Sequence, residues 1–159
     1  MKKTVNSVSI NGYTCYKKLD NINNDNVYIN NKLAFLSSTI SQIHYSTGKN
    51  LVKCNIYAFE SKEINAFAAK YLDGEYAIAL SSELFLGLNI ELESYLINKD
   101  IRKYFYGKKI NIKKHIEKII DYILLFVVLH ENYHILNGHC DTYYSQGKSI
   151  TEHLANGKA

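Results

Sequence analysis

Two histidines and a glutamate stand at a spacing that suits metal binding and amide hydrolysis. His130, Glu131 and His134 form the pattern HExxH. Residues i and i+4 share one face of a helix, so both imidazoles can converge on one ion. Neutral imidazole is a good ligand for Zn²⁺. Glu131 lies about 100° around the helix, where it can accept a proton from a metal-bound water and pass it to a leaving amine. The pattern therefore predicts a zinc-dependent peptidase, with His130 and His134 as ligands and Glu131 as the acid/base.

A long helix is expected to carry this motif. Apolar residues recur at helical spacing over 112–137, and Gly138 follows at a position where glycine readily ends a helix. The lysine-rich stretch 108–118 also contains Glu117, and Asp121 follows it, so we interpret it as a solvated helix face rather than a nucleic-acid patch. The predicted apolar stripe of the helix consists of Ile112, Ile116, Ile119, Ile120, Ile123 and Val127.

The elements before this helix are expected to alternate between helix and strand. Apolar residues at spacings of four and three predict a helix over 29–46, with His44 in its last turn as a surface residue or one favoured by the helix dipole, rather than a ligand. Alternation over 51–59 predicts a half-buried strand. Asp73-Gly74 between two apolar runs predicts a tight hairpin. Two helices are expected next, a short one capped by Ser81-Ser82-Glu83 and ending at Leu88, and another over 91–105.

This element order predicts a single α+β domain over residues 1–159. Helices should flank a few short antiparallel strands. The polar segment 1–26 is expected to be an irregular arm, containing a short hairpin and then a loop, and residues 141–159 a tail.

Composition narrows the classes of partner and compartment. The net charge is +4, and only one of the 19 basic residues is an arginine, which argues against a nucleic-acid reader built on arginine forks. The three cysteines are odd in number and widely spaced, which indicates reduced thiols in a cytoplasmic protein. No apolar segment follows Lys2-Lys3, and the strongest apolar run, 119–129, is shorter than the ~20 residues of a membrane span. We therefore expect no secretory signal and no membrane association.

Residues 130–139 as a whole form an HExxHxxxGH pattern. It resembles the active-site helix of bacterial gluzincin-type metallopeptidases, especially the Lit-type phage-exclusion peptidases, and is similar to the HExxH segments of M48-type and ImmA/IrrE-type proteases. The stretches 64–69 and 76–80 resemble the hairpin that precedes this helix, so the resemblance covers roughly residues 50–140. It implies a zincin-like fold with a small antiparallel sheet, and an edge strand that binds an extended protein or peptide substrate by β-augmentation.

The third zinc ligand is where the sequence departs from that pattern. These families supply it from a downstream helix, commonly as an acidic residue, and this chain ends at Ala159 before any such motif. Glu152 lies 18 residues after His134 and is the favoured candidate. His139 comes next, with Asp141 and His153 behind it.

Two other outcomes also stand: a site with two protein ligands and waters, and a truncated chain. The alternative function is accordingly a non-catalytic, zincin-like interaction or regulatory module. The oligomeric state is left open.

Overall fold

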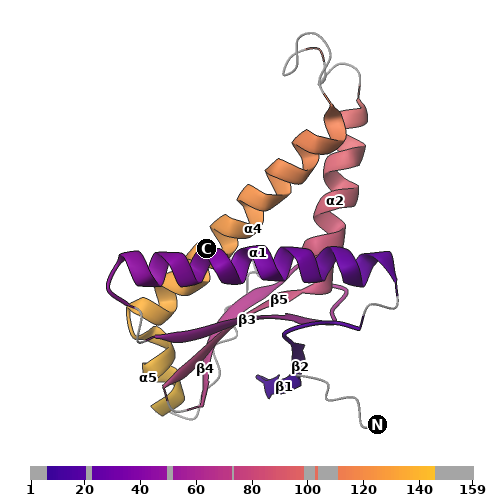
Figure 1. Ribbon diagram of the computed structural model, residues 1–159. Coiled ribbons are helices and arrows are strands. Elements are labelled where there is room, and N and C mark those ends of the chain that lie inside the picture. Colours follow the sequence, from indigo (N-terminus) through magenta and orange to yellow (C-terminus); the bar gives the residue numbers. More distant parts are fainter. Residues whose placement is uncertain are drawn as a thin grey trace, which may run out of the picture.

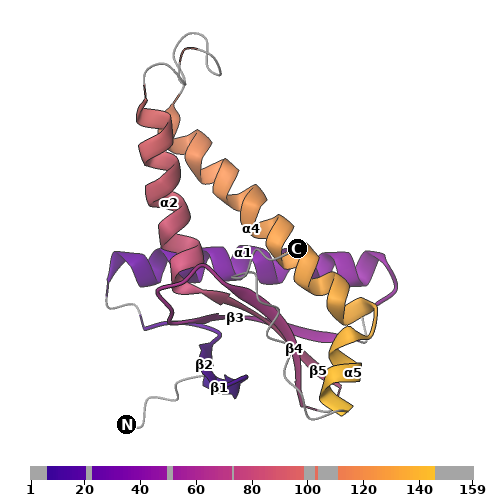
Figure 2. The same cartoon turned by 180° about the vertical axis from the view of Figure 1, so that it is seen from behind.

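The structure, a computed structural model, describes residues 7–20, 23–49, 52–72, 74–98, 103 and 111–145. These residues form an α+β fold in which helices pack on a curled five-stranded sheet (Figures 1 and 2). In chain order the elements are β1 (Ser7–Ile10), β2 (Tyr13–Tyr16), α1 (Asn24–Ser46), β3 (Lys53–Phe59), β4 (Ala66–Leu72), β5 (Glu75–Ser81), α2 (Ser82–Ile97), α4 (Ile112–Leu136) and α5 (His139–Ser145).

The sheet is mixed, with strand order β1-β2-β3-β5-β4. Three pairings are antiparallel, but β3 and β5 are parallel, with Ile56 opposite Ile78. The prediction of a purely antiparallel sheet is therefore wrong in this one pairing. The reason is topological: β5 returns from its hairpin into the position between β3 and β4, which places β4 at the edge. Local alternation of residue types does not reveal which strand becomes the neighbour.

Two hairpins build most of the sheet, and their turns follow from residue type. Asn11 and Gly12 both have positive φ, 54° and 81°, which is the backbone of the two-residue turn that suits strand twist. The β1–β2 hairpin is thus the short hairpin that was expected within the N-terminal arm. The predicted β4–β5 hairpin is confirmed, with Leu72 opposite Glu75 and Gly74 at φ 71°.

Both faces of the central strands are buried, which differs from the expected half-buried strand at 51–59. Ile56 and Ala58 face the helices, while Tyr57 and Phe59 face a second cluster completed by Ile10 and the β1–β2 hairpin. The hairpin can do this because β2 pairs with only the last residues of β3 and then curls under the sheet. Residues of β3, β4 and β5 therefore belong to a core on each side of the sheet.

The helices lie on one face of this sheet, and the predicted end of α1, start of α2 and bounds of α4 are confirmed to within one residue. α1 begins five residues earlier than predicted because the Asn23 side chain accepts a hydrogen bond from the Asn26 amide at 2.8 Å and caps it. Ser81 caps α2, as predicted. However, α2 is one continuous helix and not two, because residues 88–91 contain no helix-breaking residue and the turns run on through Gly87.

α4 is the longest described helix, and Figure 1 shows it running diagonally from the tip beside α2 down to α5. It is buried through Ile116, Ile120, Leu124, Val128 and Ile135. The buried face of α4 is therefore rotated relative to the predicted stripe. Leu124 and Val128 are buried, whereas Ile123 and Val127 are only half-buried. By length and composition α4 alone among the described helices could span a membrane, a test that core helices of soluble proteins also pass.

Candidate metal centre

The HExxH residues occupy the last two turns of α4. Gly138 adopts φ 74° just past the helix end, as predicted, and α5 begins directly at His139. The chain therefore turns back beside the motif. His130 is exposed, His134 is half-buried, and Glu131 is only 3% exposed. The two histidines thus face solvent, and the glutamate between them faces the protein interior.

The two imidazoles converge through their Nε2 atoms. His130 Nε2 and His134 Nε2 are 3.3 Å apart, and the ring planes are nearly perpendicular. Two nitrogens that bind one tetrahedral Zn²⁺ at 2.0–2.1 Å are separated by about 3.3–3.4 Å. The structure therefore brings together the two predicted ligands at the spacing that a shared zinc ion requires.

His139 contacts the other nitrogen of His134. The two Nδ1 atoms are 2.8 Å apart, so a single proton joins them in a hydrogen bond. His139 thus lies beside Nδ1 of His134, whereas a third zinc ligand would lie beside the two Nε2 atoms. A histidine ligand commonly donates its free N–H to a partner that sets its tautomer and ring orientation. His139 occupies this partner position on His134.

Glu131 points into the interior near Cys140, at the start of α5. Burial raises the pKa of the Cys140 thiol to about 12, and the charges of Asp141 and Glu131 add to that rise. Burial likewise raises the pKa of Cys54 to about 12. Both thiols are therefore protonated at neutral pH in this structure. The described cysteines are free thiols, in agreement with the sequence-based expectation.

Asp141 anchors α5 to the hairpin instead of joining the histidines. Its carboxylate accepts hydrogen bonds from Lys70 Nζ at 2.9 Å and from Tyr76 Oη at 2.9 and 3.0 Å. The hydrogen bond from Lys70 lowers the pKa of this carboxyl, and the one from Tyr76 lowers it further, against the effect of burial. The Asp141 carboxylate thus holds α5 against β4 and β5.

Among residues 7–145, apart from the gaps given above, no group of three His, Cys, Asp or Glu side chains is arranged to hold a metal ion. Glu152 and His153, two of the candidates for the third ligand, lie outside the described residues. The structure therefore supplies the paired histidines and leaves the identity of a third ligand as a prediction.

One contact to the motif was not expected from the sequence. His44, at the end of α1, is 4% exposed, and its Nε2 lies 2.8 Å from Oδ1 of the buried Asn132, inside HExxH. The prediction of a surface histidine is wrong. His44 follows Ile40 by four residues and so continues the buried stripe of α1, which is the signal that could have placed it.

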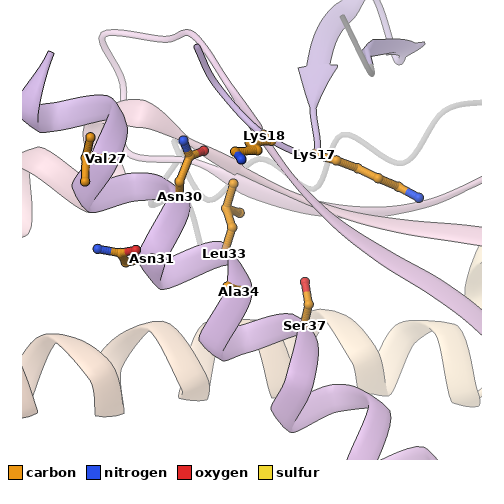
Figure 3. A pocket seen from close by; sticks show the side chains of 8 residues that line it. All are labelled: Lys17, Lys18, Val27, Asn30, Asn31, Leu33, Ala34 and Ser37. Atoms are coloured by element: carbon orange, nitrogen blue, oxygen red, sulfur yellow. The ribbon is translucent and has the colours of Figure 1, made fainter. Parts of the chain in front are cut away.

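A separate hollow of about 360 Å³ lies between α1 and the residues after β2 (Figure 3). Lys17, Lys18 and Asn31 line it, together with Asn30, whose side chain bonds the Leu19 backbone at 2.8 and 2.9 Å. None of the three HExxH residues lines this hollow. The hollow lies where the segment after β2 packs against α1, and it does not belong to the candidate metal centre.

Comparison with models of known families, with curated proteins and with solved structures finds no match to this chain. The functional argument therefore rests on the arrangement of its own residues.

Proposed function

We propose that this protein is a zinc-dependent peptidase whose metal centre includes His130 and His134. The observation that carries the proposal is the 3.3 Å separation of the two Nε2 atoms, because it equals the distance between two ligands of one tetrahedral zinc ion. The resemblance of residues 130–139 to gluzincin-type active-site helices supports the same conclusion. When bound there, zinc supplies a Lewis acid that polarises a carbonyl and lowers the pKa of water.

The protein residues divide the remaining work. We assign the acid/base role to Glu131 from its position in the motif; its side chain is buried and faces the interior, so this role requires it to turn toward the histidine pair when substrate binds. His139 holds the tautomer of His134 that presents Nε2 to the ion. Glu152 remains our candidate for the third ligand.

The substrate we propose is an extended protein or peptide segment. β4 is one of the two edge strands of the described sheet and packs against both α4 and α5, so a sheet edge lies close to the motif. An edge strand offers unpaired backbone groups to an added strand. Partners of other classes, nucleic acid and membrane, are not part of this proposal, and a cytoplasmic location is proposed with it.

Zinc content measured by mass spectrometry tests the metal centre. Folded wild-type protein should hold about one equivalent, and His130→Ala and His134→Ala should lose it. His115→Ala removes a histidine from the same helix, 15 residues before His130, and should keep the metal. Less than about half an equivalent in folded wild-type protein contradicts the proposal.

Hydrolysis of a mixed library of fluorogenic peptides tests catalysis separately. Glu131→Gln should keep zinc and lower kcat/KM by at least about 100-fold. The alternative function, a non-catalytic module that holds zinc, is favoured by the absence of a third ligand among the described residues. It predicts bound zinc with no cleavage that depends on Glu131.

A further inference from the structure

The side of α4 that faces away from the sheet is also apolar. Tyr122 and Phe126 are 71% and 70% exposed, and Tyr133 is 58% exposed. Leu129 and Leu136 are each 38% exposed. We refer to these five residues as the outer seam. Val128 and Ile135, by contrast, are buried against the rest of the protein. The second half of α4 is thus apolar on two opposite sides, of which the described chain covers one.

The outer seam has the spacing of a helix that pairs with another helix. Its residues follow one another at intervals of four, three, four and three, so they form one straight ridge over four turns of α4. That spacing is the a/d pattern of two-helix packing. A convex helical ridge suits the holes of a neighbouring helix, whereas an extended peptide needs a groove. A helix that is apolar on all sides is normally covered on all sides.

We propose that the outer seam is a dimer interface, occupied by the same seam of a second copy of this chain in antiparallel orientation. The pattern is self-complementary about a point between residues 127 and 128. With the twofold axis there, Tyr122 lies opposite Tyr133 of the partner subunit, and Phe126 lies opposite Leu129 of the partner subunit. Each large aromatic residue therefore meets an apolar residue, and the contact is isologous, as closed dimers require.

The exposed area of the seam, if fully buried, reaches the lower limit for such a dimer. An aromatic side chain has about 150–250 Å² of surface, so the exposed fractions of the five residues amount to roughly 500 Å² per copy. Two copies then bury about 1,000 Å², the lower limit for a specific interface. A single seam already lies in the upper range for the largest apolar patch on a monomer.

A lipid bilayer suits this surface less well. The seam covers 15 residues, about 22 Å of helix, which is shorter than the ~30 Å hydrocarbon core. His130, Glu131 and Asn132 lie within the same segment and would be costly inside lipid. Tyr133 of the seam lies beside the rings of His134 and His139, with ring centroids 6.1 and 6.2 Å apart, but the interface does not use the Nε2 atoms of His130 and His134, so the proposed dimer does not require bound zinc.

Sedimentation equilibrium of the full chain tests the dimer, with folding of each variant verified by circular dichroism. Wild-type protein should show a concentration-dependent dimer, and Phe126→Lys should weaken association by at least about tenfold. Tyr45→Lys replaces an aromatic residue that is 78% exposed on α1 and is not part of the seam, and should leave association unchanged. A wild-type monomer at about 100 μM, or equal loss in both variants, overturns the proposal.

Disulfide cross-linking tests the position of the axis. An equimolar mixture of Phe126→Cys and Leu129→Cys should form a covalent heterodimer under mild oxidation, whereas a mixture of Phe126→Cys and Ser38→Cys, at an exposed position of α1, should not. Equal cross-linking in the two mixtures overturns the antiparallel arrangement. Flotation with vesicles of neutral and anionic lipids provides the remaining comparison. Vesicle binding that Phe126→Lys abolishes, by a protein that sediments as a monomer, assigns the seam to lipid and overturns the dimer.

Discussion

The hydrogen bond between His44 and Asn132 offers a quantitative test of how α1 positions the HExxH segment. Both residues are at least 96% buried, and the two side chains are joined at 2.8 Å across 88 residues of sequence. Deleting one partner leaves the other without its bond in a site that water does not reach, at a cost of about 1–3 kcal/mol. Loss of packing adds to this cost, so His44→Ala and Asn132→Ala should each lower the free energy of unfolding by about 2–3 kcal/mol.

The double variant separates the bond from the packing. Once both partners are removed, no unpaired group remains, so the two effects should fall short of additivity by about 1–2 kcal/mol. Urea unfolding followed by circular dichroism measures all three variants. Ser41→Ala combined with Asn132→Ala is the control, because Ser41 is exposed on the same helix and its hydroxyl donates to the Ser37 carbonyl at 2.9 Å.

Additivity of the His44 and Asn132 effects within about 0.5 kcal/mol would refute the bond as an energetic link. Zinc content adds a second criterion. His44→Ala should keep bound zinc under conditions where it remains folded, because His44 contacts Asn132 and not the Nε2 atoms of the ligand pair. Loss of zinc from folded His44→Ala would show that its role was misassigned.

Three further predictions concern the turn and helix that follow the motif. His139→Ala should weaken zinc binding by about 10–100-fold in competition with a chromogenic chelator, because His134 loses the partner of its Nδ1 atom; unchanged affinity would contradict this role. Gly138→Ala should lower the free energy of unfolding by about 1–2 kcal/mol, because the left-handed backbone strains alanine although space for a methyl group is open; a denaturation midpoint equal to that of wild-type protein would argue against this. The pKa of Asp141 is lowered in the folded protein. Its contribution to the free energy of unfolding, about 1 kcal/mol, should therefore be complete at pH values above the unfolded-state pKa near 4, and it should vanish as the pH falls through the folded-state pKa. Melting of Asp141→Asn between pH 2 and pH 7 checks this, and a difference from wild-type protein that persists at pH 2 would contradict it.

The sequence by itself determined the features that depend on neighbouring residues. The β4–β5 hairpin follows from Asp73-Gly74, and the end of α4 follows from Gly138, because backbone preference at one or two residues decides each. The pairing of His130 with His134 is equally local, since i and i+4 must share a helix face. The metal and the catalysis that this pair implies remain predictions.

Only the tertiary structure decided which elements meet. β5 lies between β3 and β4, His44 is drawn into the core beneath the motif, and His139 swings back to the far nitrogen of His134. The pairing of β3 with β5 and the contact of His44 with Asn132 join residues far apart in the chain, so no local pattern shows that they meet. These contacts arise because burying the apolar faces of α1, α4 and the sheet together fixes how each helix is rotated, and that rotation determines which polar groups come within hydrogen-bonding distance.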